Sequence, residues 1–444
     1  HEQNGPDMTT PIAQQIEALV APLFGGQLPV GVQAWDGSSA GPDGTPTVIL
    51  RSPRALAHIA WAPGELGMAR AYIAGDLDID GDIAAGLSAV WRARRDAPHG
   101  SGGRTSTVVR GLRLLAGAGA WRRPPVPEGE IVLRGRLHTK RRDAAVIHHH
   151  YDVSNTLYSL LLDENMAYSS GYWTSDDPSY GIADAQRDKL DMICRKLGLS
   201  PGKHLLDVGC GWGALSIHAA REYGARVTGI TISAEQLAFA TERVTALDLG
   251  HLVDLRLLDY RDLTDGHYDA ISVIEMGEHV GKGNYPAFAA SLHRLLAEEG
   301  RLLVQQMSRG GSHPGGGPFI ERYITPDMHM RPVQETIGIL ADAGFEIRDV
   351  HAMREHYVHT VAAWQRQLER RWDEVVAAVS VTQARVWQLY LAGGSLAFAE
   401  NRMGVDQILS VKPNPAGASG MPPTRLGWEP SPPAKRRVVR EQVR

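Results

Sequence analysis

The chain has 444 residues, a hydrophobic content of 43% and a formal net charge of −4 at pH 7. This length predicts about two or three domains, each with a real core. The ordinary composition and near-neutral charge exclude wholesale disorder and a strongly basic nucleic-acid-binding protein.

The number of cysteines and the hydropathy of the chain indicate where in the cell the protein is located. The two cysteines, Cys194 and Cys210, stand in different sequence contexts and offer no disulfide framework, which fits a reducing cytoplasm. No uninterrupted apolar run approaches the roughly 20 residues of a membrane-spanning helix. We therefore expect a cytoplasmic protein whose contact with lipid is at most peripheral.

The N-terminal segment, from about Thr10 to Trp91, mixes short helical and strand-like patterns. Residues 46–52, PTVILRS, predict a strand because of their β-branched content. The segment therefore predicts a small α+β lobe, which we place at residues 8–125.

A basic region follows, because residues 92–142 carry many Arg and Lys side chains among few acids. One interpretation is a solvated linker, which we place at residues 126–145. The other is a partly amphipathic surface for anionic lipid headgroups, since residues 108–115 offer apolar anchors beside Arg110 and Arg113. Aromatic residues that could stack on bases are sparse there, so nucleic acid is not an expected partner.

Beyond residue 146, helix-length segments alternate with short apolar strands, the pattern of a doubly wound α/β sheet. The expected strands are residues 204–209, 225–231, 253–259, 268–275 and 300–307. We therefore predict a Rossmann-like domain over residues 146–413. The Pro-rich tail, residues 414–444, ends in KRRVVREQVR and is predicted to be disordered.

The first of these strands runs into a glycine-rich turn, LLDVGCGWGALS, at residues 205–216. Glycines allow close backbone approach to a nucleotide, and open α/β sheets bind such ligands at the carboxyl ends of their strands. The spacing is D-x-G-x-G-x-G, whereas a dinucleotide-binding turn has G-x-G-x-x-G. The pattern favours S-adenosylmethionine over NAD. The candidate cofactor residues are Asp207, Gly209, Gly211 and Gly213.

Two further strand ends carry polar residues. Thr231, Ser233 and Gln236 follow the second strand, and Asp259 and Tyr260 end the third. An acid or amide at the second strand end can hold ribose hydroxyls, and a carboxylate near the third can accept from an adenine amino group. We therefore expect ribose and adenine contacts from these residues.

Upstream of the glycine turn, residues 148–173 read HHHYDVSNTLYSLLLDENMAYSSGYW, the most distinctive stretch of the chain. Together with LDVGCGWG, VTGITISAEQ, DYRDL and EHVGKGNY, it resembles the cyclopropane-fatty-acid synthase family of S-adenosylmethionine-dependent acyl-lipid methyltransferases. HYVHTVAAW and RVWQLYLAGGSLAF match the C-terminal helical region of that family.

The resemblance implies a fold and a reaction. It implies a class I methyltransferase domain after an N-terminal lipid-binding lobe, to which residues 65–83 are similar, and it implies a dimer. Tyr168 and Ser169 would contact the methionine part of S-adenosylmethionine. The methyl group would go to the cis double bond of an unsaturated, oleoyl-type phospholipid chain at the inner face of the membrane.

The base of the family reaction is where this chain departs from the pattern. In cyclopropane synthases the base is thought to be a bicarbonate held by a cysteine, a glutamate, a histidine, a tyrosine and a backbone group. The resemblance places the glutamate at Glu278 and the tyrosine at Tyr357, but Ser170 replaces the cysteine and Gln305 the histidine. Serine and glutamine donate hydrogen bonds but supply no imidazolium charge. These four residues are the candidate catalytic residues, and bicarbonate binding stays open.

The altered pocket bears on the product. If deprotonation is delayed or redirected, a hydride shift moves the carbocation before the new methyl group loses its proton, and a methylene-branched chain results. We favour this product, of the 10-methylene-stearoyl type, which a partner reductase would convert to a methyl branch. The alternative is a cyclopropane ring on the same substrate.

Three other interpretations are set aside. A non-catalytic lipid-binding protein would not need the intact glycine turn, and a methyltransferase for a soluble nucleophile would not need the lipid-family N-terminal lobe. No metal site is expected, because three consecutive histidines, His148 to His150, cannot readily converge on one ion.

Overall fold

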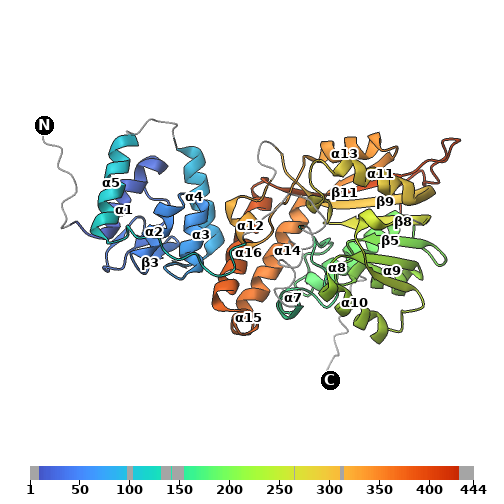
Figure 1. Ribbon diagram of the computed structural model, residues 1–444, viewed down its shortest axis with the longest axis horizontal. Coiled ribbons are helices and arrows are strands. Elements are labelled where there is room, and N and C mark those ends of the chain that lie inside the picture. The colour runs from blue at the N-terminus through green and yellow to red at the C-terminus, as the bar shows by residue number, and fades with distance from the viewer. Residues whose placement is uncertain are drawn as a thin grey trace, which may run out of the picture. The chain divides into compact units, whose positions relative to one another are not determined.

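The computed structural model describes residues 10–97, 104–131, 142, 155–264, 266–310 and 315–429. The chain divides into two compact units (Figure 1). Unit 1 comprises His1–Arg142, Ser312–Met328 and Trp364–Arg402. Unit 2 comprises Asp143–Gly311, His329–Ala363 and Met403–Arg444.

Unit 1 contains a mixed sheet of four strands in the order β2-β1-β3-β4. The strands are β1 (Gly31–Gln33), β2 (Ser39–Ala40), β3 (Thr47–Leu50) and β4 (Leu77–Asp80). β1 pairs with β3 in parallel, and the other two pairs are antiparallel. The strand predicted at residues 46–52 is β3, so the expected α+β character of the N-terminal segment is confirmed.

Helices cover this sheet. They are α1 (Ile12–Val20), η1 (Ala21–Phe24), α2 (Arg54–Trp61), α3 (Glu65–Ile73), α4 (Ile83–Asp96) and α5 (Arg104–Gly117). The later segments of unit 1 add α12 (Pro318–Tyr323), α15 (Trp372–Ala378) and α16 (Val381–Ala399). Asp82 begins α4 by accepting hydrogen bonds from the backbone N–H groups of Ala84 and Ala85, which satisfies two otherwise unpaired donors of the first turn.

The unit boundaries differ from the predicted lobe at 8–125 and domain at 146–413, because α12 and α16 belong to unit 1. Phe319 of α12 and Val386 of α16 are buried in one cluster with Ile73 of α3. Apolar burial between segments so far apart in the chain leaves no local sequence signal. Most of the predicted basic linker, residues 126–145, lies outside the described residues.

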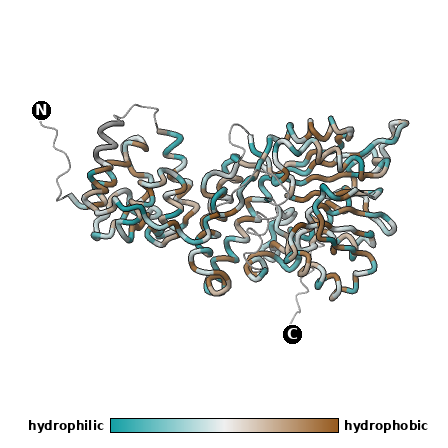
Figure 2. The backbone as a smooth tube through the Cα atoms, in the orientation of Figure 1, coloured by the Kyte–Doolittle hydropathy of each residue, from teal (hydrophilic) through white to brown (hydrophobic). Residues whose placement is uncertain are grey.

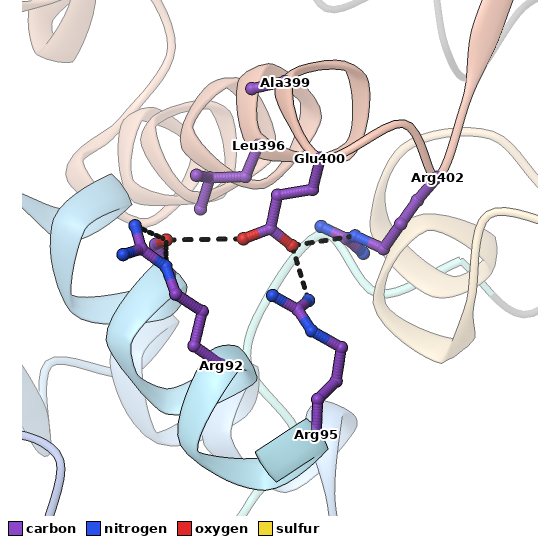
Figure 3. A pocket seen from close by; sticks show the side chains of 7 residues that line it. Arg92, Arg95, Leu396, Ala399, Glu400 and Arg402 are labelled. Carbon is purple, nitrogen blue, oxygen red and sulfur yellow. Dashed lines mark hydrogen bonds and ion pairs between the residues drawn. The ribbon is translucent and has the colours of Figure 1, made fainter.

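Polar contacts also join α16 to α4, around a small pocket lined by three arginines (Figure 3). Glu400 accepts a hydrogen bond from Arg95 Nη1 at 2.9 Å, and its second oxygen lies 3.3 Å from Ser88 Oγ. Arg402 Nε lies 3.4 Å from Glu400, and Arg92 donates to Ser88 Oγ at 2.8 Å. Since Glu400 is engaged on both oxygens, this cluster fastens the end of α16 to the N-terminal segment.

Unit 2 is built on a sheet of seven strands in the order β10-β11-β9-β8-β5-β6-β7 (Figure 1). The five predicted strands are β5 (His204–Val208), β6 (Arg226–Thr231), β7 (Val253–Leu257), β8 (Tyr268–Ile274) and β9 (Leu296–Ser308). They pair in parallel. The other two strands, β10 (Glu346–Ala352) and β11 (Gly404–Val411), were not predicted, and β11 runs antiparallel to both neighbours. The predicted Rossmann-like α/β fold is confirmed.

Helices pack on both faces of this sheet. The helical segments are α7 (Asn155–Leu161), α8 (Ile182–Leu197), α9 (Ala214–Tyr223), α10 (Ala234–Ala246), η2 (Tyr260–Asp262), η3 (Gly277–His279), α11 (Tyr285–Leu295) and α13 (Val333–Asp342). A further helix, α14 (Arg354–Arg370), begins in unit 2, and its residues from Trp364 onward belong to unit 1. Leu205 packs in a core cluster with α8 and α9, whereas its neighbour Leu206 packs in a second cluster with α11 and α13. Adjacent strand residues point to opposite faces, so the central strands β5 and β8 are buried along most of their length, and Figure 2 shows hydrophobic stretches of backbone within unit 2.

The segment after β11 differs from the predicted disorder as far as residue 429. Trp428 is 7% exposed and belongs to the core cluster of α8 and α9. Arg425 pairs with Asp349 at 3.1 Å, and Glu429 accepts a hydrogen bond from Tyr172. The Pro-rich composition predicted disorder, but a buried tryptophan and two polar contacts dock the segment as far as residue 429. Residues 430–444 lie outside the described residues.

Candidate active site

The carboxyl ends of β5, β6 and β8 meet at one edge of the sheet in unit 2. Val208 of β5 pairs with Ile230 of β6 and with Val273 of β8. Open α/β sheets bind their ligands outside this edge. The loops that follow these three strands therefore form the candidate active site.

The glycine turn follows β5 at this edge. Gly209, Gly211 and Gly213 have φ values of 78°, 55° and 82°, in the left-handed region that suits glycine. Gly209 N donates to Ile230 O at 2.9 Å, which ties the turn to β6. A Cβ at Gly209 would lie 3.0 Å from Met276 Cγ, whereas one at Gly211 would meet no atom within 4 Å. The turn is thus a backbone cradle that a nucleotide can approach closely, and it fits S-adenosylmethionine.

Asp207 supports this turn from within the sheet. It is buried, and its two carboxylate oxygens accept hydrogen bonds from Ser216 Oγ and Ser272 Oγ, both at 2.8 Å. Burial raises the pKa of Asp207, and the two serine hydroxyls act in the opposite direction. Asp207 was predicted to contact the cofactor. In the structure its carboxylate instead bonds to side chains of α9 and β8, and it links these two elements to β5 below the glycine turn.

The three polar residues predicted after the second strand form one group. Thr231 Oγ1 lies 3.0 Å from Gln236 Oε1, and Ser233 Oγ accepts from Gln236 N at 3.2 Å. Ser233 thereby caps the N-terminus of α10. These residues lie beside the glycine turn. The turn is hydrogen-bonded to Ile230 of β6, and β6 ends at the next residue, Thr231.

Asp259 and Tyr260 follow β7, whose end pairs with Thr231. Asp259 accepts from Arg261 Nε at 2.8 Å and from Arg261 Nη2 at 2.6 Å, a partner that the sequence analysis did not anticipate. The Tyr260 ring packs edge-on against Phe288 at a centroid distance of 4.8 Å. Both residues therefore lie at the expected strand end, with Asp259 oriented by an arginine.

Tyr168 and Ser169 contact groups next to the glycine turn. The Tyr168 ring packs against Tyr158, and Tyr158 packs against Trp212 of the turn at a centroid distance of 4.6 Å. Ser169 Oγ accepts from Lys189 Nζ at 2.8 Å. Burial lowers the pKa of the Lys189 ammonium to about 8, although nearby carboxylates favour its charged form.

Three of the four candidate catalytic residues converge on a carboxylate that the sequence analysis missed, Glu275. Glu275 Oε1 accepts from Ser170 N at 2.9 Å and from Gln305 Nε2 at 2.8 Å. Glu275 Oε2 accepts from Tyr357 OH at 2.7 Å. Ser170 contributes its backbone N–H, since its hydroxyl donates to Gly171 O. The replaced positions of the family pocket thus surround a side chain of this protein.

Glu275 follows directly after β8, at the carboxyl edge of the sheet. Its φ is 50°, an uncommon conformation for a residue with a side chain, and its N–H donates to Gln305 O at 2.6 Å. Burial raises the pKa of Glu275, and its hydrogen bonds and the Lys189 charge counter this. The strand-end argument that selected Asp259 would also have selected Glu275, so a sequence signal for it existed.

The fourth candidate, Glu278, lies in η3 and is 1% exposed. Its Oε1 accepts from Met307 N, and among the residues that the structure describes its Oε2 has no hydrogen-bond partner. Burial and the neighbouring charge of Glu275 raise the pKa of Glu278 to about 8. The surroundings of Glu278 therefore favour its neutral form.

Within the described part of the chain, no group of three or more His, Cys, Asp or Glu side chains could hold a metal ion. His148 to His150 lie outside that part. Cys194 and Cys210 are both free and buried.

Comparisons with known proteins agree with this geometry. The family model described as mycolic acid cyclopropane synthetase matches residues 138–408. A probable fatty acid methyltransferase of Mycobacterium tuberculosis is 36% identical over 434 residues, which cover 95% of this chain and 100% of the relative. The cyclopropane-fatty-acyl-phospholipid synthase of Escherichia coli K12 is 36% identical over 273 residues, 62% of this chain and 69% of the relative.

Solved structures show the same similarity. The crystal structure of the mycolic acid cyclopropane synthase CmaA1, complexed with SAH and CTAB, is 29% identical with a TM-score of 0.57. The match covers 60% of this chain and 97% of that chain.

Proposed function

Because the chain belongs to the mycolic acid cyclopropane synthetase family, and is an S-adenosylmethionine-dependent enzyme that modifies lipid acyl chains, we propose a specific substrate and product. The substrate is the cis double bond of an oleoyl-type chain in a phospholipid. The product carries a methylene branch, of the 10-methylene-stearoyl type. The alternative product is a cyclopropane ring on the same chain.

The observation that carries this proposal is the altered pocket. Gln305 stands where cyclopropane synthases have a histidine, and it donates to Glu275. Glutamine supplies no positive charge. The base of this site is therefore surrounded by other hydrogen-bond donors, and by less positive charge, than the base that the resemblance implies. A different base changes the interval before deprotonation, and a longer interval permits the hydride shift that leads to a methylene branch. The similarity to a probable fatty acid methyltransferase along its whole length supports this choice.

The residues of unit 2 have distinct roles in this proposal. The three glycines of the turn hold the nucleotide, Gln236 holds the ribose, and Tyr168 and Ser169 contact the methionine part. Bound S-adenosylmethionine supplies an electrophilic methyl group on a sulfonium. The remaining task of the protein is to hold the alkene and to remove one proton.

We assign contact with the phospholipid to unit 1. Among the described residues, no helix is long and apolar enough to cross a membrane. Large apolar side chains are nevertheless exposed on unit 1: Leu23, Trp61, Met68, Leu112 and Trp121. Such side chains favour peripheral association with the inner face of the membrane. A dimer, and a partner reductase that acts on the methylene product, complete the proposal.

The proton NMR spectrum of recovered acyl chains tests the product. The protein is incubated with S-adenosylmethionine and vesicles of oleoyl phospholipid, and a reaction without S-adenosylmethionine is the control. Olefinic methylene protons are the expected result. Strongly shielded ring protons would establish the alternative, and an unchanged oleoyl spectrum would contradict both products.

A double variant tests the pocket argument itself. Ser170→Cys combined with Gln305→His restores the two family residues and is expected to raise the share of cyclopropane in the product. The same NMR assay measures that share. An unchanged ratio of products would remove the basis for linking these positions to the methylene branch.

A further inference from the structure

The geometry points to Glu275 as the general base of this reaction, so that a side chain of the protein replaces the bicarbonate that cyclopropane synthases are thought to bind. This inference rests on the proposed function, because it names the group that removes the proton. It goes further, because it predicts independence from any added anion.

The hydrogen bonds of Glu275 are the first support. Its carboxylate accepts from three donors on three separate segments, namely Ser170 N, Gln305 Nε2 and Tyr357 OH. A carboxylate has about four lone-pair sites, so three donors fix its orientation and leave one site for a proton. The donors therefore hold a base in place without saturating it.

The location of Glu275 is the second support. The next residue, Met276, lies against Gly209, where an added Cβ would approach its Cγ to 3.0 Å. Ser170 N binds Glu275, and the adjacent Ser169 is a predicted contact of the methionine part. Glu275 thus lies between the cofactor turn and the residues assigned to the reactive end of the cofactor.

The backbone conformation is the third support. Glu275 has a φ of 50°, which glycine would adopt without strain, yet the position carries a long acidic side chain. Strained residues persist where the surrounding structure holds them, and they cluster at active sites. The N–H of Glu275 donates to the carbonyl oxygen of Gln305 in β9. This hydrogen bond between the end of β8 and β9 holds Glu275 in its unusual conformation.

Glu278 does not compete for this role. It accepts from Met307 N, and burial together with the Glu275 charge raises its pKa to about 8. Two neighbouring carboxylates do not both ionise readily, and the one with more donors keeps the charge. Burial raises the pKa of Glu275 as well, but three hydrogen bonds and the Lys189 charge act in the opposite direction, so the structure stabilises the charged form of Glu275 more than that of Glu278.

The proposed step balances in atoms and electrons. An alkene carbon forms a bond to the methyl group as the carbon–sulfur bond breaks, which leaves a cation on the other alkene carbon. A hydride shift moves the cation to the methyl-bearing carbon. Glu275 then takes a proton from the methyl group, and the electrons of that C–H bond form the methylene double bond. Glu275, now a carboxylic acid, releases the proton to solvent before the next turnover.

Two measurements test this inference. The turnover of the wild-type protein is compared in buffer stripped of carbon dioxide and in buffer with added bicarbonate, and equal rates are expected. Glu275→Gln keeps the size and can keep the bond from Ser170 N, but it cannot take a proton. It is expected to lose about 100-fold or more in turnover, the usual contribution of a general base, while S-adenosylhomocysteine binds with unchanged affinity.

Controls separate this inference from the proposed product. Glu298→Gln, at an exposed glutamate of β9, is expected to keep wild-type turnover. A wild-type rate that requires bicarbonate, or a Glu275→Gln variant with wild-type turnover, would overturn the role of Glu275 whatever product is formed. A ring product made without bicarbonate would overturn the proposed product and leave Glu275 as the base.

Discussion

Single residues of the site differ mainly in how many hydrogen bonds their carboxylates accept. The Asp207 carboxylate accepts two hydrogen bonds and the Glu275 carboxylate accepts three, and these bonds stabilise the charged forms. Glu278 accepts from Met307 N, and its second oxygen has no hydrogen-bond partner among the described residues. Burial is the largest cause of a raised pKa in all three acids, and hydrogen bonds act against it in Asp207 and Glu275 more than in Glu278.

This difference predicts how Glu278 affects stability. Its pKa is raised from an ordinary 4.5 to about 8 in the folded protein, so the unfolded chain ionises first as the pH rises. The stability linked to this group is present below about pH 4.5 and is lost as the pH rises to about 8, at about 1.4 kcal/mol per unit of pKa difference. Glu278→Gln does not titrate, so it should gain stability relative to wild type over this range.

Unfolding midpoints of the two proteins at about pH 5 and about pH 8 measure this effect. The difference between variant and wild type should grow with pH. Parallel curves would mean that Glu278 is ionised in the folded protein.

The glycine turn is the element on which cofactor binding depends. Gly209 has a φ of 78°, and a Cβ there would press on the Met276 side chain at 3.0 Å. Gly209→Ala should therefore shift the turn and weaken binding of S-adenosylhomocysteine about tenfold or more, since a left-handed alanine costs about 1–2 kcal/mol.

Isothermal titration calorimetry provides the measurement. Gly250→Ala is the matched control, because Gly250 is free of positive φ and of any atom within 4 Å of an added Cβ. Equal affinities for the two variants would show that the turn does not approach the nucleotide.

Trp428 is the large buried side chain of the segment after β11. Trp428→Ala should destabilise unit 2 by about 3–5 kcal/mol, because it leaves a cavity in the core cluster of α8 and α9. Leu426→Ala, at a side chain that is 91% exposed, should change stability by less than about 0.5 kcal/mol. Denaturant unfolding of both variants compares them, and similar midpoints would mean that Trp428 is not docked in solution.

At the scale of the whole molecule, unit 1 is assembled from three separate stretches of chain, and unit 2 from three others. The stretches of the two units alternate along the chain, so neither unit can form from one continuous segment. We assign the chemistry to unit 2, which holds the glycine turn and Glu275, and the membrane contact to unit 1, where large apolar side chains are exposed.

That assignment predicts which surface residues matter for lipid. Trp61→Ser and Trp121→Ser should each weaken partition into anionic oleoyl vesicles by about tenfold, since burying one large apolar side chain contributes about 1.5–3 kcal/mol. Leu247→Ser, on unit 2 and 42% exposed in the wild type, should leave partition unchanged. Vesicle co-sedimentation measures all three, and equal partition would place the membrane contact elsewhere.

The sequence by itself determined the elements whose signals are local. The five parallel strands, the glycine turn between β5 and α9 and the order of the strand-end loops all follow from hydrophobic runs and glycine spacing. The motif pattern also led to the correct family and cofactor. These features are readable because backbone conformation and strand burial depend on residues close together in the chain.

Only the tertiary structure decided the contacts between distant segments. Glu275 became a site residue because Ser170, Gln305 and Tyr357 reach it from three separate segments. In the same way α12 and α16 joined unit 1, and Trp428 docked on α8 and α9. The free energy of these contacts comes from burying apolar surface and pairing buried polar groups, and neither shows until the chain has brought the partners together.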